Sequence, residues 1–181
     1  KLNDDQLQAE LGDALARDSP RTVWLHENIL SSAAGPIVGR ELSNARTKVT
    51  RLNLTDNKLG DKGVAGLMST LDADATGNLR ALNLGVNGLG ASSVLLIANA
   101  LAKGRLDALR ELRMGGNPLG AAGGLGIAIA LRRPNSALIT LNLGNSAIGD
   151  EGGAAIADAL DGDGVQGSAS VRSLQLPNCG L

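Results

Sequence analysis

The chain contains 181 residues, of which 43% are apolar and 19% are charged, which is enough to bury the core of one domain. Its 17 basic and 18 acidic residues give a formal net charge of -1, so it lacks the basic excess that a nucleic-acid backbone attracts. One cysteine excludes an internal disulfide, and no apolar run reaches the roughly 18 to 20 residues that span a bilayer. We therefore predict a cytoplasmic protein with no nucleic-acid partner and no membrane insertion.

The first predicted element is a helix within residues 1–19. Leu7, Leu11 and Leu15 recur at four-residue spacing, which places them on one helix face. The segment that follows begins a repeated strand pattern that this stretch lacks. We therefore interpret residues 1–19 as the helix half of a partial N-terminal repeat.

Residues 20–181 are organised by one repeated pattern. Its frame, Leu-x-x-Leu-x-Leu-x-x-Asn-x-Leu, is clearest at 49–59, 79–89 and 109–119, with degenerate copies at 20–30, 138–148 and 171–181. The asparagine position of the six copies is occupied by Asn28, Asn57, Asn87, Asn117, Ser146 and Cys179. Intervals of 29, 30, 30, 29 and 33 residues separate these positions, a period that is typical of solenoids. We predict about six repeats, the last of which is truncated after its strand.

Each copy predicts a short strand followed by a helix. The Leu-x-Leu spacing puts two leucines on one face of a strand, and the Asn side chain can bond backbone groups in the following turn. Apolar residues then recur at multiples of four residues, as at Leu59, Leu67 and Leu71, which is typical of a helix. Because Gly and Ala crowd these helices, we expect neighbouring helices to pack closely.

This pattern resembles the leucine-rich repeats, and its period and helix length are similar to the subclass typified by ribonuclease inhibitor and the Ran GTPase-activating proteins. The resemblance covers residues 20–181 and implies an α/β horseshoe, a solenoid with a concave parallel β-sheet and convex helices. It also implies protein partners, with cytoskeletal or ciliary scaffolds, immune sensors and bacterial effectors among the settings of the family. The missing last helix indicates part of a longer chain, whose uncapped ends we expect to allow self-association.

The concave bowl is the surface on which we expect a partner to bind, because the residues between the inward-pointing leucines face it. The candidate partner-binding residues are Trp24, His26, Arg51, Asn53, Asn83, Glu111, Arg113, Asn142 and Gln175. Trp24 and Arg113 are the expected anchors, because Trp and Arg dominate interface hot spots. Two alternatives stay open. The asparagines are also explained by solvation of an exposed sheet, and Trp24 by packing against an N-terminal repeat.

The sequence predicts no catalytic residue, no cofactor and no metal site. The single histidine, His26, has no Gly-x-Ser-x-Gly motif beside it, and it lies too far along the array from Cys179 to share a zinc ion. A Gly-x-Gly-x-x-Gly match at 162–167 follows a predicted helix, whereas a dinucleotide site follows a strand. A calcium loop beginning at Asp72 would place Asn83 where such loops need a Glu.

The alternative function is that of a GTPase-activating protein or another GTPase regulator of the Ran GTPase-activating-protein type, which the resemblance implies. Arg51 and Arg113 are the arginines that the predicted bowl offers to such a reaction. Neither matches the functional loop of that family, and the acidic tail of the family is absent from these residues. We therefore predict a non-enzymatic scaffold that binds a partner protein through the concave face, within a large assembly.

Overall fold

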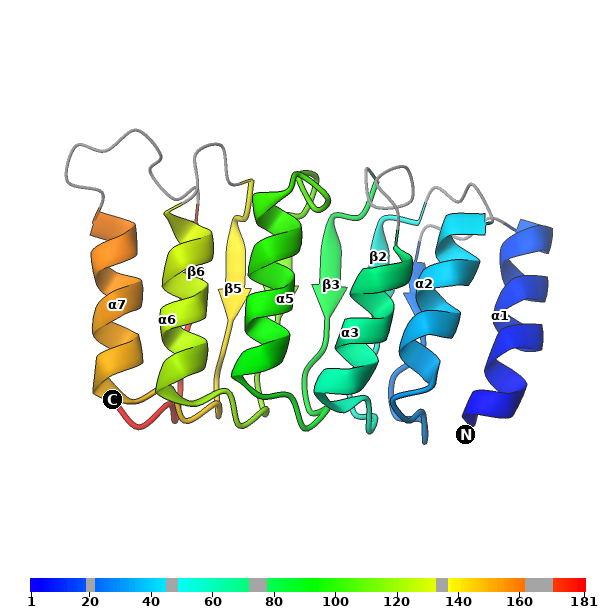
Figure 1. Ribbon diagram of the computed structural model, residues 1–181, viewed down its shortest axis with the longest axis horizontal. Coiled ribbons are helices and arrows are strands. Elements are labelled where there is room, and N and C mark those ends of the chain that lie inside the picture. Colours follow the sequence, from blue (N-terminus) through cyan, green and yellow to red (C-terminus); the bar gives the residue numbers. More distant parts are fainter. Residues whose placement is uncertain (19–21, 45–48, 72–77, 133–136, 162–170) are drawn as a thin grey trace.

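A computed structural model describes residues 1–18, 22–44, 49–71, 78–132, 137–161 and 171–181. In these residues, three-residue strands alternate with helices (Figure 1). The strands are β1 (Thr22–Trp24), β2 (Arg51–Asn53), β3 (Ala81–Asn83), β4 (Glu111–Arg113), β5 (Thr140–Asn142) and β6 (Ser173–Gln175). The helices are α1 (Asp4–Asp18), α2 (Ala34–Asn44), α3 (Gly60–Thr70), α5 (Ala91–Ala102), α6 (Gly120–Leu131) and α7 (Gly149–Asp161).

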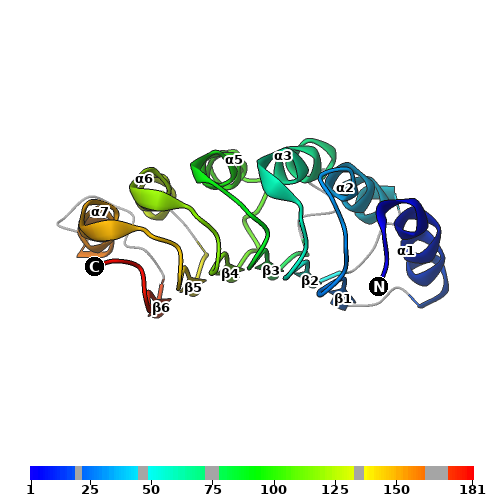
Figure 2. The same ribbon diagram turned by 90° about the horizontal axis from the view of Figure 1, so that it is seen from below.

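The strands form one parallel sheet in the order β1-β2-β3-β4-β5-β6. Neighbouring strands pair at the same frame position, so that Leu52 lies opposite Leu82, and Leu82 lies opposite Leu112. Figure 2 shows the strands on the inner side of a curved array and the helices on its outer side. The predicted α/β leucine-rich-repeat solenoid, with a concave parallel sheet and convex helices, is confirmed.

The core lies between the sheet and the layer of helices. Leu52, the central residue of β2, is buried, as are the equivalent Val23 of β1 and Leu82 of β3. From the helix side, Leu7, Leu11 and Leu15 of α1 are buried together on one stripe, as their spacing predicts. Helix α1 packs against α2 as the first helix of the layer. The division of the chain at residue 19 stays a prediction.

A column of buried side chains follows the strands and joins consecutive repeats. Asn87 is only 2% exposed. Its Nδ2 group donates hydrogen bonds to the carbonyl oxygens of Leu54, Leu84 and Gly85 at 2.9, 3.2 and 2.9 Å. Its Oδ1 atom accepts a hydrogen bond from the N–H group of Leu59 at 3.4 Å. Because Leu54 and Leu59 belong to the preceding repeat, one side chain satisfies buried backbone groups of two repeats.

The same arrangement extends to both ends of the array. The Oδ1 atom of Asn57 accepts a hydrogen bond from the N–H group of Leu30 at 3.1 Å, and that of Asn28 accepts one from Leu2 at 2.7 Å. At the other end, the buried Sγ atom of Cys179 lies 3.0 Å from a carbonyl oxygen of the preceding repeat, as a weak donor. The asparagine position of the frame therefore bonds backbone, as the pattern predicts.

Replacing Asn87 with Ala is expected to lower the free energy of unfolding by about 3 kcal/mol, because four buried hydrogen bonds are lost and a cavity is left in the interior. The matched control is Asn53→Ala in β2, which removes one part-buried hydrogen bond, from the N–H group of Thr55 at 3.0 Å. We expect that control to cost about 1 kcal/mol or less. Urea denaturation measures both values, and equal losses would contradict the role assigned to the column.

Glycines allow adjacent helices to approach closely. A Cβ atom built on Gly124 of α6 would lie 2.5 Å from the Cα atom of Gly152 in α7, a distance that packed atoms do not tolerate. A Cβ atom on Gly12 of α1 meets no atom nearer than Oε2 of Glu41 at 3.4 Å, an ordinary contact. The close helix packing expected from the Gly and Ala content is therefore present between α6 and α7.

The substitution Gly124→Ala is expected to destabilise the protein by about 1 to 3 kcal/mol, because α6 and α7 must move apart. Gly12→Ala is the control, with the same chemical change in an uncrowded helix. It is expected to stabilise by about 0.5 to 1 kcal/mol, because Ala favours the helix over Gly. Thermal melting by circular dichroism gives both signs, and stabilisation by Gly124→Ala would contradict the packing described here.

Candidate functional site

The sheet register builds two rows of side chains across the concave face. The third residues of the strands, here called the third row, are Trp24, Asn53, Asn83, Arg113, Asn142 and Gln175. The first residues of β1 to β4, here called the first row, are Thr22, Arg51, Ala81 and Glu111. Because the residue between them points into the core, both rows face the bowl. The third row matches the polar row that the spacing predicts.

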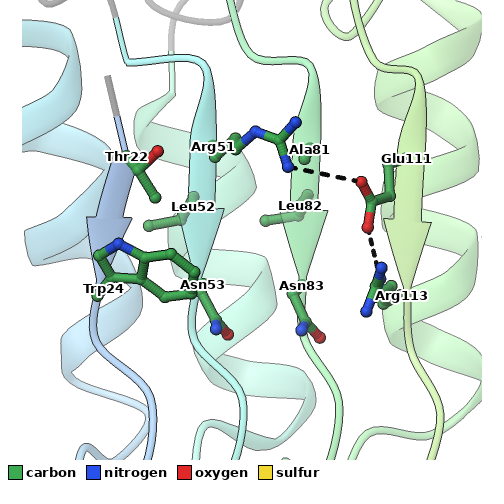
Figure 3. A pocket seen from close by; sticks show the side chains of 10 residues that line it. All are labelled: Thr22, Trp24, Arg51, Leu52, Asn53, Ala81, Leu82, Asn83, Glu111 and Arg113. Carbon is green, nitrogen blue, oxygen red and sulfur yellow. Dashed lines mark ion pairs between the residues drawn. The ribbon is translucent and has the colours of Figure 1, made fainter. Parts of the chain in front are cut away.

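The two rows enclose a shallow hollow of about 160 Å³ between β1 and β4 (Figure 3). It brings together six of the predicted site residues, Trp24, Arg51, Asn53, Asn83, Glu111 and Arg113. Thr22, Leu52, Ala81 and Leu82 complete its lining. His26, Asn142 and Gln175 of the predicted set lie outside this hollow.

One carboxylate holds both arginines of the hollow. The Nε atom of Arg113 lies 2.5 Å from Oε1 of Glu111, and the Nη1 atom of Arg51 lies 4.0 Å from Oε2 of the same side chain. Arg51 stands two strands away from Glu111, and its side chain passes over Ala81, which leaves it room (Figure 3). Two cations against one anion leave this cluster with one unbalanced positive charge.

The asparagines of the hollow are oriented by the backbone that follows their strands. The Oδ1 atom of Asn53 accepts a hydrogen bond from Thr55 N–H at 3.0 Å, and that of Asn83 accepts one from Gly85 N–H at 3.1 Å. These asparagines therefore do not bond each other in a ladder along the sheet. Their Nδ2 groups have no hydrogen-bond partner within the described residues.

Trp24 is the large apolar side chain of the bowl, and 64% of its surface is exposed. The His26 ring lies with its centroid 5.6 Å from that of Trp24, at an interplanar angle of 75°, which is an edge-to-face contact. The prediction that both rings stand on one face is therefore correct. His26 follows β1 and is not part of it.

Asn142 and Gln175 form a separate pair at the C-terminal end of the third row. The Nδ2 group of Asn142 donates to Oε1 of Gln175 at 2.6 Å. Asn142 lines a second hollow, of about 300 Å³, which it shares with Asn83 and Arg113. Among the described residues, the one buried side-chain polar atom without a partner, Thr55 Oγ1, belongs to the lining of this second hollow.

Thr22 and Ala81 also line the hollow; the strand alternation places both on the concave face, but neither is among the candidate binding residues. The sequence contains one indication that Arg51 and Glu111 can meet: Ala81, which lies between them in the first row, has a small side chain. The pairing of those two charges across the gap needs the register of three strands. It is visible only once the sheet is assembled.

Two of the other sites weighed from the sequence fall on residues that the structure does not describe. Among the residues that it does describe, no group of three or more His, Cys, Asp or Glu side chains is placed to hold a metal ion. The glycine match at 162–167 and the start of the loop at Asp72 lie outside the described residues. None of the helices in the described ranges is long and apolar enough to cross a membrane.

Comparison with known proteins agrees with this fold. A family model described as leucine-rich repeat matches residues 46–68, 109–128 and 135–157. A solved structure of a tropomodulin C-terminal domain from Caenorhabditis elegans is similar at 19% sequence identity and a TM-score of 0.56, covering 85% of this chain and 91% of that one. No curated protein matches the sequence.

The curved parallel sheet, the buried asparagine column and the matched repeats define the fold. Each matched range contains one copy of the frame or most of one, including the copy that carries Ser146 in place of Asn. This chain therefore has the leucine-rich-repeat fold, and its sequence is similar to that family over the three matched ranges.

Acrylamide quenching of tryptophan fluorescence tests the exposure of Trp24, because the chain has no other tryptophan. With 64% of the indole exposed, we expect quenching close to that of the urea-unfolded chain, and red-shifted emission in the folded state. A blue-shifted emission that resists quenching would contradict the described geometry. It would favour the alternative in which Trp24 packs against an N-terminal repeat.

Proposed function

We propose that this protein is a non-enzymatic scaffold that binds a partner protein through the hollow between β1 and β4. The observation that carries the proposal is the exposure of Trp24, at 64%, in the same hollow as Arg51 and Arg113 on a curved face. Exposed tryptophan in the middle of polar groups is costly to leave in water, and Trp and Arg are the residue types that dominate binding hot spots.

The open shape of the hollow favours a protein segment over a small molecule. Sites for small ligands enclose most of the ligand surface, whereas this hollow of about 160 Å³ is a shallow depression on the sheet. It is open along the sheet and continues into the second hollow through Asn83 and Arg113. A shallow surface of this kind suits an extended segment that lies across several strands.

The same proposal includes the repeat subclass and the cellular location. The similarity to the ribonuclease-inhibitor and Ran GTPase-activating-protein subclass rests on the repeat period and helix length. The cytoplasmic location in a large assembly, with cytoskeletal and ciliary settings among others, rests on that resemblance. No observation here favours the alternative of GTPase activation, because neither Arg51 nor Arg113 matches the functional loop of that family.

Charge at the two ends of the array opposes self-association through these ends. Helix α1 exposes Asp5 and Glu10 at one end of the array, and α7 exposes Glu151 and Asp158 at the other. A head-to-tail contact would bring these like charges together, which is unfavourable at low salt. We therefore do not include it in the proposed function.

The convex helices provide a matched control surface. Ile129 of α6 is 63% exposed, nearly the same as Trp24, and Arg132 follows at the end of that helix. Together with Leu95 of α5, these two residues line a hollow on the helix side. The pair Ile129→Ala and Arg132→Ala thus removes one exposed apolar side chain and one arginine, as does the pair Trp24→Ala and Arg113→Ala.

Affinity capture from a native lysate of the source cells, identified by mass spectrometry, tests the proposal. We expect the Trp24→Ala and Arg113→Ala double variant to lose the partners that the unmodified protein captures, and the helix-face double variant to retain them. The thermal midpoint should change little in either variant, because all four side chains are exposed. Retention by the first variant with loss by the second would place binding on the helices and contradict the proposal.

A further inference from the structure

We propose that the segment bound in the hollow is an extended acidic peptide, with an apolar side chain against Trp24 and a carboxylate at Arg113 and Arg51. This inference rests on the proposed function and specifies the chemistry of the partner. It is carried by the orientation of the polar groups, which makes the third row a series of hydrogen-bond donors between β1 and β4.

Backbone geometry determines which end of each asparagine faces the bowl. A backbone N–H group can only donate, so the side-chain atom that it meets must be the oxygen. Thr55 N–H meets Asn53 in this way, and Gly85 N–H meets Asn83. The remaining end of both side chains is the Nδ2 group, which carries two N–H donors and cannot accept.

Most other polar groups of the hollow are also donors; the Thr22 hydroxyl and the Glu111 carboxylate are the lining groups that can accept. Trp24 offers an indole N–H that can only donate, and Arg113 and Arg51 carry guanidinium groups that have no acceptor. The one carboxylate of the lining, Glu111, is paired with Arg113 at 2.5 Å and lies 4.0 Å from Arg51, so its charge is offset by the two arginines. A ligand that satisfies this surface must therefore supply acceptors, which in a peptide are main-chain carbonyl oxygens and carboxylates.

The spacing of the row sets the length of the segment. Three strand steps separate Trp24 from Arg113, about 14 Å at roughly 4.8 Å per step. An extended chain covers this distance in about four residues, at roughly 3.3 to 3.6 Å each. The carboxylate is therefore expected three to five positions from the apolar side chain.

Charge fixes the direction of the segment across the strands. Glu27 and Asp56 are exposed on the loops that follow β1 and β2, which adds negative charge at that end of the array. At the other end, the cluster of Arg51, Glu111 and Arg113 retains one unbalanced positive charge. The acidic end of the peptide therefore lies at β4, and the apolar end at β1.

Glu111 acts in this scheme as an internal competitor for the arginines that the ligand carboxylate needs. Replacing it with Gln keeps the size of the side chain and removes its charge. We expect Glu111→Gln to bind acidic peptides about two- to fivefold more tightly, the range that one exposed ion pair contributes. Glu151→Gln, on an exposed turn of α7, changes the net charge equally and is expected to leave binding unchanged.

Panning a phage-displayed library of random nine-residue peptides on the intact protein tests the inference, with the Trp24→Ala and Arg113→Ala double variant as counter-selection. We expect the retained sequences to combine an apolar residue with Asp or Glu three to five positions away. Isothermal titration with a synthetic copy of an enriched peptide then compares its acid with the matching amide, and the protein with Glu111→Gln and Glu151→Gln. The acid should bind more tightly than the amide.

Enrichment of neutral or basic peptides, or no enrichment that depends on Trp24 and Arg113, would overturn the acidic-peptide inference. So would a Glu111→Gln variant that binds the acidic peptide no more tightly than the Glu151→Gln control. None of these outcomes affects the proposed function if lysate capture still depends on the bowl. If capture from the lysate does not depend on Trp24 and Arg113, the hollow is not the binding site and the proposed function is wrong.

Discussion

The hydrogen bonds that the buried asparagine column donates across repeat boundaries hold the array together, and the concave surface depends on them. Each strand has only three residues, so the chain leaves the sheet almost at once and turns back toward the helices. That turn is buried, and its carbonyl groups would be unpaired without Asn57, Asn87 and Asn117. Because each of these side chains also bonds the preceding repeat, the strands stay in register.

A fixed register is what turns a repeated sequence into a binding surface. It aligns the third residue of every strand, so that side chains about 30 residues apart in the chain become neighbours on the concave face. Asparagine is used in two ways in this arrangement. In the column, the Nδ2 group of Asn87 donates hydrogen bonds to buried carbonyl groups. In the third row, the Oδ1 atom of Asn83 accepts a hydrogen bond from Gly85 N–H, so its Nδ2 group faces the solvent.

Much of this architecture is predictable from the sequence, because the frame is a physical pattern. The spacing of Leu52 and Leu54 predicts a strand face, and the recurrence of the frame predicts a parallel register and the row from Trp24 to Gln175. The contacts within the row are not predictable in the same way. The link from Arg51 to Glu111 depends on the register of three strands and on the gap at Ala81.

Backbone conformation marks a second limit of sequence reasoning. The residue before the column position adopts positive φ in every repeat, and in one repeat it is Val86, at φ 51°. A β-branched residue is unfavourable in that region, so propensity argues against the conformation that the fold imposes. The repeat geometry prevails because the following Asn87 N–H is bonded to Oδ1 of Asn117 at 2.8 Å, which anchors the turn.

The division between a buried column and an open donor row is the central claim, and side-chain amide exchange with solvent measures it most directly. Nuclear magnetic resonance resolves the NH₂ protons of individual asparagines. The structure predicts slow exchange for Asn87 and Asn117, whose amides are bonded in the interior, and fast exchange for Asn53 and Asn83. Protected amides at Asn53 and Asn83, or rapid exchange at Asn87 and Asn117, would contradict the account.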